Sequence, residues 1–180
     1  MESSVFMGNH RSYVDAILMP AKNPVVFVAR LETKKWPIIG WGATAIGTIW
    51  VDRKNQESRK ATRVAVRDRL NRGQGICIFP EGMTHEGPDL KTYHPGMFYL
   101  CADGGFPITP VAIEYADPKI AWVGNEWFIP HAFRHFGKRH LDVIVEFGPT
   151  QTFTEGELGL ATIRNWTEET VLRLRKELDS

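Results

Sequence analysis

The sequence has little cysteine and no long hydrophobic run, and both shortages narrow the class of protein. Cys77 and Cys101 are the only cysteines in 180 residues, too few for a disulfide scaffold, so a reducing compartment is expected. A transmembrane helix needs about 20 consecutive apolar residues, and no run in this sequence approaches that length. No membrane-spanning helix is therefore predicted within these residues.

An excess of charge of either sign is also missing. The 22 Lys and Arg residues are balanced by 21 Asp and Glu, giving a formal net charge of +1. Because nucleic-acid-binding domains usually carry a basic surface and a recognisable motif, nucleic acid is not expected as a partner. With 43% hydrophobic and 24% charged residues, the composition is that of an ordinary globular domain. We expect one domain over residues 1–180.

A metal site is not expected either. His131 and His135 are four residues apart and could share a helix face, but no third ligand is apparent near them. The metalloprotease pattern HExxH does not occur, and the remaining histidines are isolated from other ligand residues.

Short apolar runs of strand type alternate with helix-like segments along the chain. The predicted strands are 5–8, 25–29, 47–52, 75–79, 108–115 and 141–148, and the predicted helices are 13–20, 37–46, 56–72 and 95–104. A final helix is predicted to begin near Thr167, where TEET is typical of a helix start. This alternation predicts an α/β fold with a central, mostly parallel mixed sheet flanked by helices.

The stretch NHRSYVD, residues 9–15, follows the first predicted strand and supports two interpretations. In the first, Ser12 caps a helix and Asp15, three residues on, completes a capping box. In the second, the strand delivers His10 to the edge of the sheet as a general base, and Asp15 orients its imidazole. The two are compatible, because a capped helix is a rigid place to mount an orienting carboxylate.

The stretch GICIFPEGMTHEG, residues 75–87, runs from a buried strand into a polar loop. Burying Glu81 without a partner would be costly, so this side chain is expected to have a partner or a ligand. Gly82 permits a close backbone approach. An ordinary strand-ending turn is the alternative interpretation.

Basic residues gather after the strand GTIWVD. Arg59, Arg63 and Arg67 would form one stripe on a helix, which usually indicates a solvated face. Arg53 differs because it stands at a strand end, where its guanidinium would suit a phosphate.

Together these stretches resemble the glycerolipid acyltransferase family, which includes the 1-acylglycerol-3-phosphate acyltransferases. NHRSYVD is similar to the family's block of Asn-His, four residues and Asp, GTIWVDR to its second block, and FPEG to its third. ITPVAIE, residues 108–114, is similar to the fourth, a strand centred on proline. One block alone is a weak signal, but four in the family's order, over about residues 4–150, are specific.

The resemblance implies a mechanism. The acyl donor would be a thioester, acyl-coenzyme A or acyl carrier protein, acting as co-substrate with no further cofactor. His10 would deprotonate the hydroxyl of a lysolipid acceptor, which attacks the thioester directly, and Asp15 would orient His10. Arg53 would hold an acceptor phosphate, and Glu81 and Gly82 would shape the acceptor side of the site. Neither cysteine is needed.

The sequence departs from the family after FPEG. Phosphatidate-forming members usually continue with Thr-Arg-Ser, whereas this chain has Met83, Thr84 and His85. Met83 and Thr84 are still expected to contact the acceptor, but the arginine that helps to grip phosphate is missing. Lysophosphatidic acid is therefore not expected to be clearly preferred over larger lysophospholipids or lyso-ornithine lipid.

Aromatic and cationic residues are interleaved in residues 120–140, IAWVGNEWFIPHAFRHFGKRH. Such a mixture suits the interfacial zone of a bilayer, although core aromatics under a long connection are an equal alternative. We expect peripheral contact with the cytoplasmic face of a membrane. The abrupt start of the sequence adds the expectation of an upstream anchoring segment.

Two other functions remain open. An acyl-thioester hydrolase would use His10 to activate water in place of a lysolipid. A catalytically silent module that binds lipid or acyl carrier protein is disfavoured by the presence of both His10 and Asp15.

Overall fold

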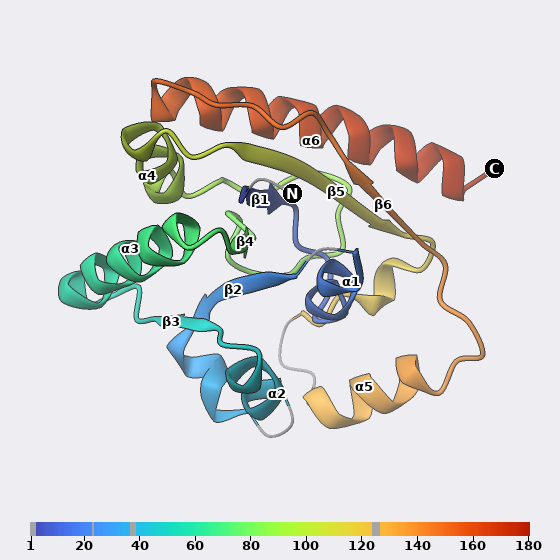
Figure 1. Ribbon diagram of the computed structural model, residues 1–180. Coiled ribbons are helices and arrows are strands. Elements are labelled where there is room, and N and C mark those ends of the chain that lie inside the picture. The colour runs from blue at the N-terminus through green and yellow to red at the C-terminus, as the bar shows by residue number, and fades with distance from the viewer. Residues whose placement is uncertain (1–2, 23, 37–38, 124–126) are drawn as a thin grey trace.

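The computed structural model describes residues 3–22, 24–36, 39–123 and 127–180, and it confirms the predicted α/β fold. Its strands form one sheet in the order β3-β2-β4-β1-β5-β6 (Figure 1). The strands are β1 Val5–Gly8, β2 Val25–Arg30, β3 Ile49–Val51, β4 Gly75–Ile78, β5 Ile108–Tyr115 and β6 Val143–Phe147. All neighbouring pairs are parallel except β5 and β6, which pair antiparallel.

Helices connect the strands and cover both faces of the sheet. They are α1 Asp15–Lys22, the 3-10 turn η1 Leu31–Lys35, α2 Ile39–Ala45, α3 Gln56–Asn71, α4 Gly96–Gly104, the 3-10 turn η2 Pro118–Ile120, α5 Phe128–Phe136 and α6 Gly156–Leu178. The predicted segment 37–46 corresponds to α2, and its first two residues lie outside the described ranges. No helix in those ranges is both long and apolar enough to cross a bilayer.

Side chains alternate between the two faces of the sheet, and each face has its own apolar core. In β1, Val5 and Met7 pack into the core formed with α3, α4 and α6. Phe6 packs into the other core, which includes Val14 and Met19 from the region of α1. Figure 1 shows α6 running along one side of the sheet, with α1 and α5 on the opposite side.

The final helix begins earlier than predicted. It starts at Gly156 and not near Thr167. Thr167 lies inside α6, fully buried, and its hydroxyl donates to the carbonyl of Ile163 at 2.8 Å. The pattern TEET therefore belongs to a helix interior, because packing of Ile163 and its neighbours against the sheet extends the helix beyond what local propensity favours.

The topology brings the ends of the parallel strands to one edge of the sheet. His10 follows β1, Glu81 follows β4, Arg30 ends β2, and Arg53 follows β3. In open α/β sheets, ligands bind at the carboxyl ends of the strands. The fold therefore gathers along one edge the residues that the sequence predicts for the site.

Candidate active site

The residue before His10 fixes the position of the loop that carries His10. Asn9 is fully buried, and its amide forms two hydrogen bonds with the backbone of Ile113 in β5, one donated at 2.7 Å and one accepted at 2.8 Å. Gly8 allows this close approach, since a Cβ there would lie 2.2 Å from the carbonyl oxygen of Val111. The loop after β1 is thus held against β5.

His10 and Asp15 lie in direct contact, as the sequence predicts for a base and its orienting acid. Nδ1 of His10 lies 2.8 Å from Oδ2 of Asp15, with the imidazole 20% exposed and the carboxylate fully buried. When Nδ1–H donates to Asp15, the neutral ring carries its lone pair on Nε2, which is the atom that a general base uses.

Asp15 also makes the capping-box contact of the first interpretation. Its Oδ2 accepts from the backbone amides of Arg11 at 2.8 Å and Ser12 at 2.9 Å, which is one half of a capping box. The hydroxyl of Tyr115 donates to Oδ1 at 2.6 Å. The carboxylate therefore stands at the first residue of α1 with several donors compensating its burial.

The loop after β4 supports His10 from the other side. The ring of Phe79 stacks on the imidazole with centroids 4.2 Å apart and planes 3° from parallel. The backbone amide of His10 donates to Oε2 of Glu81 at 2.7 Å. These contacts join the two loops that the sequence singles out.

Glu81 finds its partners within the protein. It is buried, and its Oε1 accepts from the backbone amide of Lys91 and lies within hydrogen-bond distance of Nε2 of His85, both at 2.9 Å. Nδ1 of His85 accepts from the amide of Gly87 at 3.2 Å, so the tautomer with Nε2–H donating to Glu81 satisfies both nitrogens. Its described contacts give Glu81 a role in positioning His10, and its predicted role toward the acceptor stays a prediction.

A buried ionic network behind the loop of His10 is absent from the sequence predictions. Arg11, 2% exposed, donates from Nε to Oε2 of Glu114 at 3.0 Å, and its Nη1 lies 3.0 Å from Nδ1 of His85. Arg175 of α6 pairs with the other carboxylate oxygen of Glu114. Burial raises the pKa of Glu114, whereas Arg11 and Arg175 act to lower it. The available signal was Glu114 at the end of an otherwise apolar strand.

Arg53 lies at the surface beside the loop of Glu81. Its Nη1 is 3.4 Å from the carbonyl oxygen of Gly82, and a Cβ at Gly82 would lie 2.0 Å from that nitrogen. Burial lowers the pKa of Arg53, the charge of Arg30 lowers it further, and Glu32 opposes both. Arg30, which the sequence predictions omit, thus adds a second guanidinium at this end of the sheet.

Met83 and Thr84, the other residues predicted to contact the acceptor, differ in how far their side chains are available to a ligand. Met83 is 55% exposed. The hydroxyl of Thr84 donates to the carbonyl of Trp122 at 2.7 Å and so serves a contact within the protein. The stripe of Arg59, Arg63 and Arg67 is exposed on α3, and Arg59 donates to the carbonyl of Arg53 at 2.6 Å.

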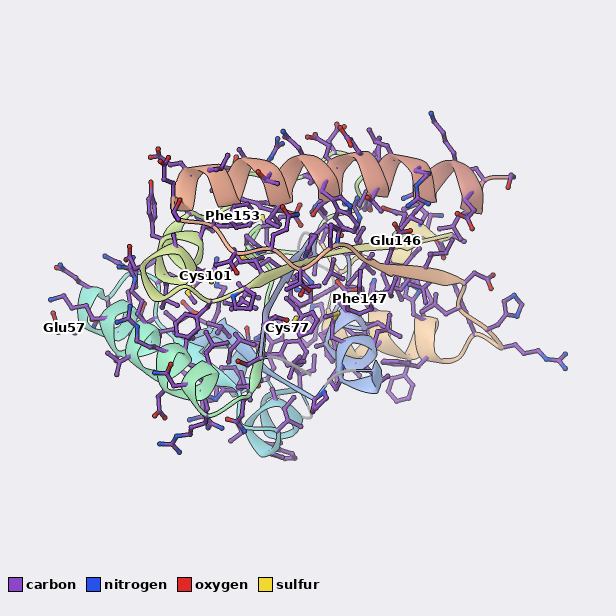
Figure 2. All side chains as sticks on the ribbon, turned by 45° about the horizontal axis from the view of Figure 1, so that its top comes forward. Glu57, Cys77, Cys101, Glu146, Phe147 and Phe153 are labelled. Atoms are coloured by element: carbon purple, nitrogen blue, oxygen red, sulfur yellow. The ribbon has the colours of Figure 1, made fainter. Side chains whose placement is uncertain are left out.

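Neither thiol is suited to nucleophilic chemistry. Cys77 and Cys101 are buried and unpaired (Figure 2). Burial raises the pKa of Cys77, and it raises that of Cys101 to about 12, so neither supplies a thiolate near neutral pH. Within the described ranges, no three side chains of His, Cys, Asp or Glu gather as a metal site.

The comparisons with known proteins agree with this geometry. A family model described as Acyltransferase matches residues 2–114. A lyso-ornithine lipid O-acyltransferase of Pseudomonas aeruginosa is 29% identical over 163 residues, which cover 86% of this chain and 62% of that protein. A 1-acyl-sn-glycerol-3-phosphate acyltransferase of Neisseria gonorrhoeae is 33% identical over 109 residues, covering 61% and 43% of the two chains. The match thus spans roughly half of these relatives' length.

The fold also has a counterpart among solved structures. The crystal structure of the 1-acyl-sn-glycerophosphate acyltransferase PlsC from Thermotoga maritima superposes with a TM-score of 0.73 at 16% identity. The match covers 97% of this chain and 67% of that one.

Proposed function

Since this chain belongs to the acyltransferase family whose model matches residues 2–114, we propose that it moves a fatty acyl group from a thioester donor to the hydroxyl of a lysolipid. The contact of 2.8 Å between His10 and the buried Asp15 carries this proposal. Relatives named as acyltransferases for lyso-ornithine lipid, 1-acyl-sn-glycerol-3-phosphate and lysophosphatidylcholine support a lysolipid acceptor. Acyl-coenzyme A or acyl carrier protein serves as co-substrate.

The proposed reaction moves one proton and exchanges one bond. Nε2 of His10 takes the proton of the acceptor hydroxyl while the oxygen attacks the thioester carbonyl carbon. The new C–O bond forms, the C–S bond breaks, and the imidazolium returns the proton to the departing thiolate. Asp15 stabilises the imidazolium in between and keeps the ring oriented. No covalent acyl-enzyme is required, in keeping with the two buried thiols.

The acceptor headgroup is proposed to lie at the ends of β2, β3 and β4. Arg53 and Arg30 supply positive charge there, and the backbone of Gly82 leaves room for a close approach. Met83 offers exposed apolar surface beside them, and Thr84 positions the loop through Trp122. Because acceptor and product are membrane lipids, we place the chain in peripheral contact with the cytoplasmic face of a membrane.

Mass spectrometry of the products tests this function. The purified chain is offered acyl-coenzyme A or acyl carrier protein thioester together with a panel of lysolipids. The expected product is a lipid with one added acyl chain, and it should fall by about 100-fold or more in His10→Ala. His140→Ala removes an exposed histidine far from the site in sequence and should match the unmodified chain.

Two results would contradict the proposal. Release of free fatty acid without acylated lipid, in the presence of acceptor, would assign the chain to the thioester hydrolases. Full acyl transfer by His10→Ala would remove the histidine from the chemistry.

A further inference from the structure

Helix α5 buries its two histidines and exposes three of its apolar side chains, the reverse of what is usual for a helix on the surface of a soluble domain. His131 and His135 are 1% and 4% exposed. Ile129, Phe133 and Phe136 are 41%, 76% and 60% exposed, and their spacing of four and three residues places them in one stripe. This inversion needs an explanation outside the packing of the domain itself.

The inner face of α5 is held by specific contacts, so the orientation of the helix is fixed. Nδ1 of His131 lies 3.2 Å from the hydroxyl of Tyr13, and Nε2 lies 3.1 Å from the carbonyl oxygen of Lys119. The ring of Phe128 packs edge-on against Tyr13 at 5.1 Å and against Trp122 at 5.3 Å. Rotating the helix to bury its stripe would break these contacts.

We infer that the stripe is a docking surface for a bilayer that contains anionic lipid. This inference deepens the proposed function, because it names the face that meets the membrane. Trp127, 82% exposed, precedes the helix, and aromatic residues of this kind favour the interface between headgroups and acyl chains. We call Trp127, Ile129, Phe133 and Phe136 the docking stripe.

The charges around the docking stripe fit a surface of anionic lipid headgroups. Residues 127–140 contain Arg134, Lys138 and Arg139 and no acidic residue. Cations beside interfacial aromatics are attracted to anionic headgroups. Lys138 also pairs with Asp117, and Arg134 and Arg139 both have exposed side chains.

An exposed aromatic residue of α2 extends the surface. Trp41 of α2 is 74% exposed, and Figure 1 shows α2 and α5 at the same lower edge of the molecule, away from α6. Trp36, just before α2, packs against Trp122 with ring centroids 4.7 Å apart and against Phe128 at 6.3 Å. The two helices are thus linked through a ring cluster.

The docking stripe is connected to both loops of the active site. Ser12 donates to the carbonyl of Ile120 at 3.0 Å, and Thr84 donates to the carbonyl of Trp122 at 2.7 Å. With the Tyr13–His131 contact, these bonds tie the NHRSYVD loop and the EGMTH loop to the segment that carries α5. A helix seated on the bilayer would therefore present the catalytic loops to the lipid surface in one orientation.

Co-sedimentation with vesicles tests the inference. The vesicles consist of phosphatidylcholine with or without phosphatidylglycerol, and no substrate is added. The double variant Trp127→Ser/Phe133→Ser should bind the anionic vesicles more weakly by on the order of tenfold, because two large aromatic side chains leave the interface. Val64→Ser/Leu158→Ser removes two exposed apolar side chains of α3 and α6 and should bind like the unmodified chain.

The readouts separate this inference from the proposed function. With a short-chain lysolipid dissolved as monomers, the docking variant should keep its acyl transfer, while transfer to vesicle-embedded lysolipid falls. If the unmodified chain shows no acyl transfer but binds vesicles through the docking stripe, only the proposed function is refuted. Equal vesicle binding by the docking variant and the unmodified chain would overturn the inference, as would self-association that depends on Phe133 without any effect on vesicle binding.

Discussion

At the scale of single residues, Asp15 makes the contacts of both interpretations that the sequence analysis found compatible. One carboxylate oxygen accepts hydrogen bonds from two backbone amides and contacts Nδ1 of His10, and the other accepts from the hydroxyl of Tyr115. The bonds to Arg11 and Ser12 belong to the helix start, whereas we propose that the bond to His10 serves the chemistry. Under this proposal, capping and catalysis share one buried carboxylate, so its substitution has to be chosen to separate them.

Asp15→Asn makes that separation. The amide oxygen can take the place of Oδ2 and keep the backbone bonds, while the NH₂ group can donate to the hydroxyl of Tyr115. The charge that stabilises an imidazolium is lost. Acyl transfer should fall by on the order of 100-fold or more, with the melting temperature little changed.

The variant Asp15→Ala is the matched control, because it should lose both activity and stability. Steady-state rates and thermal unfolding of both variants give the comparison. If Asp15→Asn unfolds early but keeps its rate per folded molecule, the carboxylate is a cap only.

Glu81 offers a second test of role at a single side chain. Its contacts with the amides of His10 and Lys91 and with His85 predict that it positions the base. Glu81→Gln removes the charge, and its NH₂ group replaces one of the two carboxylate oxygens that accept in these three contacts. We expect kcat to fall by roughly tenfold with the KM for the lysolipid nearly unchanged.

Whether kcat or the acceptor KM changes decides between the proposed roles of Glu81. A rise in the acceptor KM with an unchanged kcat would show that the carboxylate shapes the acceptor side, as first expected from the sequence. Glu86→Gln, at an exposed position five residues on, serves as the control for a general loss of charge in this loop.

At the scale of elements, the sequence predicted the strands well, misplaced the start of α6 and did not predict α5. The strands begin and end within two residues of their predicted bounds, since their apolar runs coincide with burial on both faces. Helix α6 was misplaced because Gly156 and Gly159 near its start are poor helix formers. Both glycines are buried, with Gly156 against Tyr99 and Gly159 against Phe153, so tertiary contact decides the start.

Helix α5 carries a prediction about pH. His135 is 4% exposed, and neither of its ring nitrogens has a hydrogen-bond partner within the described ranges. Burial lowers its pKa from the ordinary value of 6.5, and His131, Lys138 and Arg134 add to this effect while Asp117 opposes it. The unfolded chain therefore binds a proton at higher pH than the folded chain does. Stability from the neutral imidazole is fully present above 6.5 and declines as the pH falls below that value.

Replacing the imidazole with an apolar side chain should remove this dependence. In His135→Leu, the free energy of unfolding should rise by roughly 1–2 kcal/mol, because two unpaired buried nitrogens disappear. When the free energy of unfolding is measured with denaturant between pH 7.5 and 5.5, it should change less with pH in the variant than in the unmodified chain. The same dependence on pH in both proteins would mean that another group titrates. His140→Leu, which removes an exposed ring, controls for the loss of a histidine.

At the scale of the whole molecule, the site is a product of topology as much as of motif. The resemblance predicted His10, Asp15 and Arg53 from blocks of a few residues. It gave no sign of the network that runs from Glu81 through His85 and Arg11 to Glu114, since those residues are up to 103 positions apart in the chain. Only the adjacency of β1, β4 and β5 brings them together.

The same topology determines the charge offered to an acceptor. Arg30 ends β2 and Arg53 follows the neighbouring strand β3, and the two side chains act on each other electrostatically. The missing arginine after FPEG indicated one cation at the site, whereas the fold places two at this edge. A lysophosphatidic acid headgroup carries close to two negative charges at neutral pH and so needs both. Lyso-ornithine lipid carries an amine beside its carboxylate and depends less on a second guanidinium.

We therefore expect the unmodified chain to use lysophosphatidic acid and lyso-ornithine lipid with comparable efficiency, and Arg30→Ala to change that ratio. Transfer to lysophosphatidic acid should fall by on the order of tenfold, the effect of about one charge-assisted hydrogen bond, with a smaller loss for lyso-ornithine lipid. An equimolar competition read by mass spectrometry measures both products at once.

Arg30→Lys should recover part of the loss, because a point charge replaces the bidentate fork. Arg67→Ala on the exposed stripe of α3 should leave the ratio unchanged. Equal losses for both acceptors would make Arg30 structural, and strong selection of lysophosphatidic acid by the unmodified chain would overturn the expected lack of preference.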